Sequence, residues 1–162
     1  MKFKFIQYDI RSDDVCELIK KYRFDAIINF AAESHVDKSI HSSNLFVDTN
    51  IKGTNNLLAC CNDFIKNGLL SNEFRFIQVS TDEVYGSLTQ TELAFTESSI
   101  LKPTNPYSAS KASADLIAMA YFKTHNFPVI ITRCSNNFGP YQYPEKLIPL
   151  AINKIANNKK IP

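Results

Sequence analysis

Four short apolar runs alternate along this chain with segments that show helical spacing. The runs cover residues 3–8, 25–30, 74–80 and 127–133. Helical patterns follow them: one begins at Ser12 or Asp13, and others cover residues 43–65, 106–125 and 145–157. Short apolar runs of this kind are typical of strands buried in a parallel sheet. The alternation therefore predicts an α/β fold with a doubly wound parallel sheet.

Small and polar residues follow each apolar run where the strand should end. They form four loops: Asp9-Ile10, residues 29–35, residues 80–84 and residues 134–137. In doubly wound sheets, ligands bind outside the carboxyl ends of the strands. One such loop alone could be ordinary turn chemistry. Because four loops agree, the sequence predicts a ligand site at this edge.

Composition excludes several classes of protein. The net charge of the 162 residues is only +2, and the one dense basic spot is Lys159-Lys160, which argues against nucleic-acid binding. The apolar runs are shorter than the ~18 residues that cross a membrane. The four cysteines include no CxxC pair, so we expect no metal site. Disulfides remain possible on this count, but nothing resembles a signal peptide, and we expect a reduced, cytoplasmic compartment.

Tyr107 and Lys111 form a YxxxK pair at the start of a predicted helix. The i, i+4 spacing places both side chains on one helix face. A free phenol has a pKa near ~10, and a nearby ammonium favours the phenolate. Such a pair can take a proton from an alcohol while a hydride leaves the same carbon. Taken alone, the motif also fits a surface lysine beside a half-buried tyrosine.

A hydroxyl and two consecutive carboxyls, Thr81, Asp82 and Glu83, follow the third apolar run. Adjacent carboxyls in a confined cleft oppose each other's ionisation, so their roles can divide into acid and base. Two acidic residues can also simply open a turn. Together with Tyr107 and Lys111, however, they predict an acid–base site.

The sequence resembles the dTDP-glucose 4,6-dehydratase family of extended short-chain dehydrogenases/reductases. Five segments carry the resemblance, in the order of the family: AAESHVDKS at 31–39, TDEVYG at 81–86, YSASK at 107–111, RCSNNFGPYQ at 133–142 and PEKLIP at 144–149. YxxxK marks only the superfamily, whereas the Thr-Asp-Glu triplet is more specific. The resemblance implies a Rossmann-like fold and NAD as cofactor.

The resemblance also implies a reaction. Tyr107, helped by Lys111, would deprotonate the 4-hydroxyl of a nucleotide-sugar as hydride passes to NAD, and Thr81 would hydrogen-bond that oxygen. Glu83 would remove the proton from carbon 5, and a protonated Asp82 would assist departure of the 6-hydroxyl as water. Return of the hydride to carbon 6 would give a 4-keto-6-deoxy sugar.

Binding residues follow from the same resemblance. Besides Tyr107 and Lys111, the residues expected to contact NAD are Asp9 and Ile10 at the adenine, and Phe30, Ala31, Ala32, Thr49 and Asn137 along the rest of the cofactor. Besides Thr81, those expected to contact the nucleotide-sugar are Ser34, Asn136, Lys146 and Leu147.

Two parts of the family pattern are not found in these residues. No glycine-rich GxxGxxG turn precedes the first strand, and the chain stops before most of the substrate-binding half of the family. We therefore expect a central fragment: residues 1–140 as an NAD-binding domain incomplete at its amino terminus, and residues 141–162 as the start of the substrate-binding region. Alone, it should bind NAD weakly or not at all. Helices 43–65 and 106–125 resemble those that pair two subunits, which predicts a homodimer.

Two other functions remain open from the sequence. A nucleotide-sugar 4-epimerase or decarboxylase would share Tyr107 and Lys111 but would not need Asp82 and Glu83 for loss of water. A non-catalytic relative, kept for dimerisation or regulation, would bind no NAD. The sequence does not distinguish thymidine from uridine diphosphate sugars or identify the downstream pathway, for which rhamnose supply is the common destination in the family.

Overall fold

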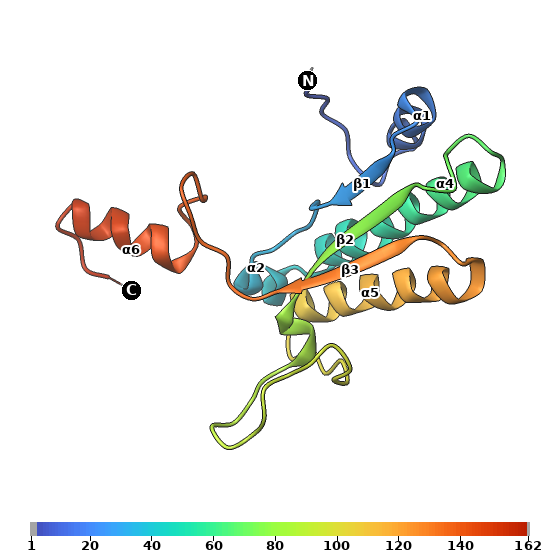
Figure 1. Ribbon diagram of the computed structural model, residues 1–162. Helices are drawn as coiled ribbons and strands as arrows, with labels where there is room; N and C mark the ends of the chain where they lie inside the picture. The colour runs from blue at the N-terminus through green and yellow to red at the C-terminus, as the bar shows by residue number, and fades with distance from the viewer. Residues whose placement is uncertain (1–2, 162) are drawn as a thin grey trace.

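The computed structural model describes residues 3–161 (Figure 1). The elements are α1 (Asp13–Tyr22), β1 (Ala26–Asn29), α2 (Val36–His41), α3 (Ser43–Phe46), the π-helix η1 (Val47–Gly53), α4 (Thr54–Lys66), β2 (Arg75–Thr81), the 3₁₀-helix η2 (Asp82–Tyr85), α5 (Pro106–His125), β3 (Val129–Cys134) and α6 (Leu147–Ala156). Among the described helices, none is long and apolar enough to cross a membrane.

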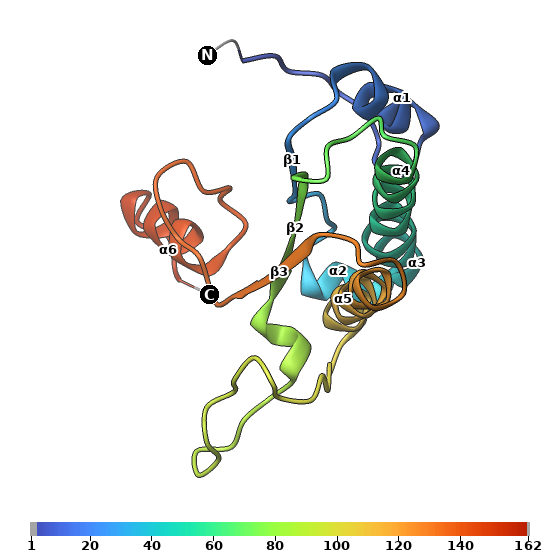
Figure 2. The ribbon, with the colours of Figure 1, turned by 45° about the vertical axis from the view of Figure 1, so that its right-hand side comes forward.

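The sheet is parallel, with the strand order β1–β2–β3. The strands are added in one direction, and crossovers between parallel strands are right-handed, so α4 and α5 pack on the same face of the sheet. Helix α1, which precedes β1, lies in the same layer (Figure 2). The row of Ile28, Ile77 and Ile130 lies in register across the other face. In Figure 2, α6 is also on that side but apart from the strands. The predicted α/β class with a parallel sheet is confirmed.

The core lies between the sheet and helices α4 and α5. Phe74, Phe76 and Phe127 are fully buried at its centre, and their rings pack at tilted angles with centroids 5.9–6.4 Å apart. The other buried members of this cluster are Ile19, Leu57, Leu58, Cys61, Leu70 and Ala118. The apolar faces predicted for the helices and strands therefore meet in one cluster, which fixes the orientation of α5 against the sheet.

Helix α5 begins at a well-defined cap. The Asn105 side chain accepts a hydrogen bond from the Ser108 backbone N–H at 2.8 Å, and the Ser108 hydroxyl accepts one from the Asn105 N–H at 3.2 Å. Pro106 occupies the first helical position, where a missing N–H costs nothing. This capping box places Tyr107 in the first turn and Lys111 one turn later.

The helix predicted over residues 43–65 is present as the consecutive elements α3, η1 and α4. The middle part is a π-helix, a wider turn that often occurs at functional sites. Gly53, its last residue, lies against Ile10: a Cβ added there would come within 2.6 Å of the Ile10 side chain. This close approach brings the turn after residue 8 onto the helix layer.

The strand predicted over residues 3–8 is wrong. These residues have no regular structure, and Phe3 and Phe5 are exposed. Among the described residues, the sheet consists of β1, β2 and β3, and residues 3–8 pair with none of them. A short apolar segment without a partner strand does not form an independent strand. Helix α2 was also missed, because its sequence is polar and only six residues long.

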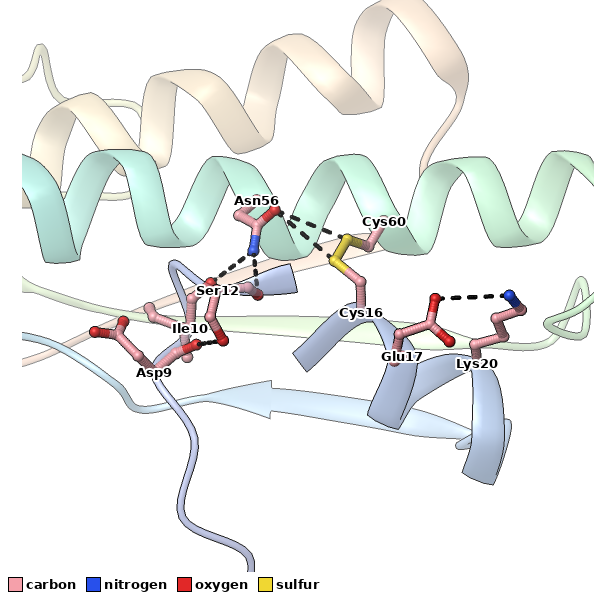
Figure 3. The surroundings of a disulfide bond; sticks show 8 residues. All are labelled: Asp9, Ile10, Ser12, Cys16, Glu17, Lys20, Asn56 and Cys60. Atoms are coloured by element: carbon pink, nitrogen blue, oxygen red, sulfur yellow. Dashed lines mark hydrogen bonds and ion pairs between the residues drawn. A yellow bond between two sulfur atoms is a disulfide. The ribbon is translucent and has the colours of Figure 1, made fainter. Parts of the chain in front are cut away.

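Cys16 of α1 and Cys60 of α4 form a disulfide (Figure 3). Their Cα atoms are 5.7 Å apart, within the usual range for such bonds. Asn56, one turn before Cys60, donates hydrogen bonds to the backbone oxygens of Ile10 (2.8 Å) and Ser12 (3.1 Å). The link and Asn56 together fasten α1 and its preceding turn to α4. This cross-link differs from the expectation of a chain adapted to a reduced compartment, since four cysteines alone do not identify a pair.

Candidate active site

A pocket of about 540 Å³ opens at the carboxyl ends of β2 and β3. Eleven of the residues predicted for catalysis or binding line it: Phe30, Ala32, Ser34, Thr81, Glu83, Tyr107, Lys111, Asn136, Asn137, Lys146 and Leu147. It is also lined by residues that were not predicted, namely Val79, Ser80, Cys134, Ser135, Gln142 and Ile148. The strand-end rule therefore located the pocket correctly.

Tyr107 lies in the first turn of α5 and is 9% exposed. Its ring meets Phe46 edge-on, with centroids 6.4 Å apart. Burial raises the pKa of Tyr107 and the nearby Glu83 carboxylate raises it further, while a hydrogen bond with the Thr81 hydroxyl acts in the opposite direction. In the protein alone, Tyr107 therefore favours the neutral phenol. A positive charge brought close to its oxygen would be needed to ease its ionisation.

Lys111 follows one turn after Tyr107 and is only 4% exposed. Its Nζ donates a hydrogen bond to the backbone oxygen of Val79 at 2.7 Å. Burial lowers the pKa of Lys111, against the raising effect of Asp115. No hydrogen bond joins Lys111 to Tyr107 among residues 3–161, so the expected help to tyrosine ionisation does not take the form of a direct contact. The ammonium instead faces the pocket from the strand side.

Thr81 and Glu83 are arranged by the turn that follows β2. The Thr81 Oγ1 caps η2 by accepting a hydrogen bond from the Glu83 backbone N–H at 3.3 Å, and it donates one to Asp82 Oδ1 at 3.4 Å. Asn105, the cap of α5, reaches Glu83 Oε2 with its amide at 3.5 Å. Glu83 lines the pocket, whereas Asp82 does not. The 3₁₀ turn thus directs the two consecutive carboxyls differently.

Asn50 holds the loop after β1 in place, and sequence analysis did not identify it. It is buried in η1; its Oδ1 accepts from the Glu33 N–H at 2.8 Å, and its Nδ2 donates to the Glu33 carbonyl at 3.0 Å. The same amide nitrogen donates to Ser110 Oγ of α5 at 2.8 Å. Three segments that surround the pocket therefore meet at one amide. An asparagine in a predicted apolar helix is the signal that could have indicated this role.

Lys146 and Ser34 are brought together although they are far apart in the sequence. Lys146 Nζ donates to the Ser34 backbone oxygen at 3.0 Å. Leu147, the first residue of α6, remains 68% exposed. Asn137 donates to the Ser135 carbonyl at 3.2 Å and accepts, through its own carbonyl, from Gln142 at 3.0 Å. The polar rim of the pocket is thus made by the segments on either side of residue 140.

The remaining predicted site residues lie outside the lining of this pocket. Besides Asp82, these are Asp9, Ile10, Ala31 and Thr49. Asp9 accepts hydrogen bonds from the Arg11 guanidinium through both carboxylate oxygens, which lowers the pKa of Asp9 to about 2. Asp9 and Arg11 line a separate hollow of about 490 Å³ with Ser12, Asp48 and Lys52. The predicted adenine end is therefore placed apart from the chemical end.

The chain is similar to nucleotide-sugar enzymes throughout its length. The dTDP-glucose 4,6-dehydratase of Neisseria meningitidis serogroup B is 44% identical over 164 residues, which cover 96% of this chain and 46% of that protein. DesIV, the dTDP-glucose 4,6-dehydratase of Streptomyces venezuelae, was solved with NAD bound; it is 46% identical with a TM-score of 0.87, over 98% of this chain and 46% of DesIV.

The UDP-glucuronic acid 4-epimerase of Bacillus cereus, solved with UDP-glucuronic acid and NAD, has a similar TM-score of 0.85 over 98% of this chain and 47% of the epimerase. Its identity is only 27%. The chain spans about half the length of the curated relatives it matches. The sequence resemblance to dehydratases is confirmed, and the model of the GDP-mannose 4,6 dehydratase family matches residues 1–162. The chain therefore belongs to the GDP-mannose 4,6 dehydratase family.

Proposed function

We propose that this chain carries the catalytic residues of an NAD-dependent nucleotide-sugar 4,6-dehydratase, a lyase that converts dTDP-glucose to dTDP-4-keto-6-deoxyglucose. One observation carries the proposal: a phenol, an ammonium, a hydroxyl and a carboxyl converge on a single pocket through Tyr107, Lys111, Thr81 and Glu83. The higher identity to dehydratases, 44–46% against 27% for the epimerase, favours dehydration over the alternative reactions.

The residues of the pocket fit the nicotinamide end of NAD. Phe30 and Ala32 offer an apolar wall, while Lys111 and Asn137 offer donors for ribose oxygens. Ser80 Oγ, which is buried at the same strand end, has no hydrogen bond of good geometry within residues 3–161 and lies near the Asp115 carboxyl. When bound, NAD supplies the acceptor and later the donor of the hydride. Asp9, Ile10, Ala31 and Thr49 would contact the remainder of the cofactor, towards the adenine.

The chain's own groups divide the proton transfers between them. Tyr107, as phenolate, takes the proton of the sugar 4-hydroxyl, and the Thr81 hydroxyl hydrogen-bonds the same oxygen. The resulting 4-ketone acidifies carbon 5, whose proton passes to Glu83. Asp82, in its protonated form, donates to the departing 6-hydroxyl, so that water leaves. The 3₁₀ turn supports a difference in role between the two carboxyls because Glu83 lines the pocket and Asp82 does not.

The substrate is proposed to lie across the polar rim. Lys146 already reaches the Ser34 backbone at 3.0 Å, so its ammonium is near the pocket and available to a diphosphate. Asn136 and Leu147 line the same rim. This supports residues 141–162 as the start of a substrate-binding region that follows the cofactor-binding domain of residues 1–140.

The helix layer supports the proposed homodimer. Leu45 and Val47 before α4, and Leu116, Met119 and Phe122 on α5, are each 41–56% exposed. Helices α4 and α5 are in contact, and Figure 2 shows them on the side of the sheet opposite α6. Two such pairs, one from each subunit, would bury these apolar side chains.

We place the enzyme in the cytoplasm, where nucleotide-sugars are made.

The test separates dehydration from oxidation in the protein at its natural length. The Asp82→Asn/Glu83→Gln variant should still reduce bound NAD when dTDP-glucose is added, as measured by absorbance at 340 nm, but should form the 4-keto-6-deoxy product at least about 100-fold more slowly. UDP-glucose serves as the competing substrate. Unchanged product formation in this variant would show that Asp82 and Glu83 are not the acid–base pair, whereas NAD reduction by the wild-type protein without this product would favour the epimerase or decarboxylase. No NAD reduction by the wild-type protein would favour a non-catalytic relative.

A further inference from the structure

A buried charged pair lies directly behind the proposed catalytic lysine. Asp115 follows Lys111 by one turn of α5 and is completely buried. Its Oδ2 accepts a hydrogen bond from Arg133 Nε of β3 at 2.8 Å, and the Arg133 side chain is 14% exposed. Neither residue lines the pocket. The chemistry described above assigns no role to this pair.

Arg133 connects Asp115 to the turn that bears the acid–base couple. Its Nη1 donates to the Tyr85 hydroxyl at 2.8 Å, and its guanidinium lies 5.1 Å from the centroid of the same ring. Tyr85 ends η2, two residues after Glu83. Hydrogen bonds therefore join η2 to α5 through Tyr85, Arg133 and Asp115, and Lys111 lies one turn before Asp115 on the same helix.

The second oxygen of Asp115 is left without a fixed partner. Oδ1 has no hydrogen bond of good geometry among the described residues, although the Ser80 hydroxyl lies close enough to the carboxyl to lower its pKa. A buried ion pair contributes little net stability, and a buried oxygen without a hydrogen bond is costly. Stability alone does not account for a carboxylate in this position. Its place one turn from a buried ammonium suggests an electrostatic role.

Neighbouring charges oppose the effect of burial on the pKa of Asp115 and on the pKa of Lys111. Burial raises the pKa of the Asp115 carboxyl, while Arg133 and Lys111 oppose this effect. Burial lowers the pKa of the Lys111 ammonium, while Asp115 opposes that effect. Arg133 thus favours the charged form of Asp115, which in turn favours the charged form of Lys111.

We propose that Asp115 is a positioning residue which, held in place by Arg133, provides the counter-ion of the buried Lys111 ammonium. The proposal rests on the proposed function of Lys111 beside Tyr107. Its consequence is that Lys111 stays charged over the working pH range although it is almost entirely buried. Tyr85 supports the arrangement by fixing the other side of the Arg133 guanidinium.

The other groups near the reacting pair limit how the effect can be measured. Cys134 of β3 raises the pKa of both Lys111 and Tyr107, and the nearby Ser80 hydroxyl of β2 lowers the pKa of Asp115. Glu83 and Asp82 of η2 act on Tyr107. These groups are therefore left unchanged in every variant, and only Asp115 and Tyr85 are substituted.

The experiment compares Asp115→Asn, Asp115→Glu, Tyr85→Phe and wild type in the protein at its natural length. Asp115→Asn removes the countercharge but keeps the shape. We expect the alkaline limb of the kcat/KM profile, where Lys111 loses its proton, to move down by at least about one pH unit. Asp115→Glu keeps the negative charge, so the alkaline limb should return most of the way to its wild-type position. Tyr85→Phe, which leaves the Asp115–Arg133 pair, should give a smaller shift.

A stability control and a direct measurement make the outcome decisive. Phe127→Leu, in the core and outside the pocket, should lower the melting temperature without moving the limb. In parallel, NMR of ¹³Cε-labelled lysine, assigned with Lys111→Arg, follows the Lys111 pKa, which should fall in Asp115→Asn even in protein without turnover. An unchanged Lys111 titration in the folded Asp115→Asn variant would overturn the inference and leave the proposed function intact. A wild-type protein that forms no 4-keto product but shows the Lys111 shift would refute the function alone.

Discussion

The interior at the ends of β2 and α5 differs sharply from the segments that surround it. Tyr107 and Lys111 are almost entirely buried and are held by a capped helix, a strand carbonyl and an edge-on aromatic contact. Next to residues of the rim, Phe138 and Tyr143 are 73% and 72% exposed, and residues 3–8, which lie beside α1, have no regular structure. The groups assigned to chemistry are therefore built into the fold, whereas many groups assigned to binding lie on open segments.

This contrast assigns different energetic roles to the two regions. In the interior, the fold has already met the entropic cost of positioning the side chains, so a substitution should affect the chemical step. On the rim, Lys146 and its neighbours are ordered mainly by their own loop contacts, so a substitution should affect affinity. Three substitutions test this division.

The largest effect is expected from Tyr107→Phe. Loss of the phenolic oxygen removes the proposed base, so kcat should fall by about 10²–10⁴-fold, with little change in melting temperature. Tyr121→Phe is the matched control, because Tyr121 is on the same helix but packs against His125 and Phe127 at the far end. Product formation is followed by the absorbance of the 4-keto sugar in alkali. Equal activity of the two variants would show that the interior does not perform the chemistry.

A smaller effect, on stability, is expected from Gly86→Ala. Gly86 is the cap residue that follows η2, with φ +97°, and an added Cβ would clash with the backbone oxygen of Lys102. Both the positive φ and the clash should destabilise the fold by about 2–3 kcal/mol in urea unfolding. Gly68→Ala shares a positive φ but has nothing within 4 Å of the added Cβ, so it should cost only about 1 kcal/mol. An equal loss of unfolding free energy in the two variants would mean that the turn after η2 is not tightly packed against Lys102.

The smallest effect is expected from Lys146→Ala on the rim. Loss of one ammonium near a diphosphate should raise KM for dTDP-glucose by about tenfold, while kcat and melting temperature remain unchanged. Lys154→Ala on α6 is the control, because Lys154 does not line the pocket. If kcat fell instead, Lys146 would belong with the interior groups, and the division between the two regions would fail.

The sequence was sufficient for features that depend on local pattern. The apolar runs near residues 26, 75 and 129 became the three strands, and the cap at Asn105 with Pro106 defined where α5 begins. The strand-end rule then located the pocket, since parallel strands bring their carboxyl ends to one edge. Local pattern failed at residues 3–8, because a strand also requires a partner that pattern alone does not supply.

Contacts between distant residues were beyond the reach of sequence reasoning. Asn50 bridges the loop at Glu33 to Ser110, which is 60 residues away, and Asp115 pairs with Arg133 on another element. Asn50 and Asp115 are each polar at a position that helical spacing assigns to the interior. The type of residue suggests that a partner exists, but only the fold identifies the partner.

The Cys16–Cys60 disulfide makes the surrounding medium a determinant of how firmly the amino-terminal turn is held. The link closes a loop of 44 residues in sequence separation, a constraint on the unfolded chain worth about 2–4 kcal/mol. Protein reduced with dithiothreitol should therefore melt at a lower temperature than protein that keeps the disulfide. A sample that contains both forms should show two bands on a non-reducing gel. In a glutathione-rich cell the disulfide would be reduced, and the hydrogen bonds from the Asn56 amide would then hold Ile10 and Ser12 against α4.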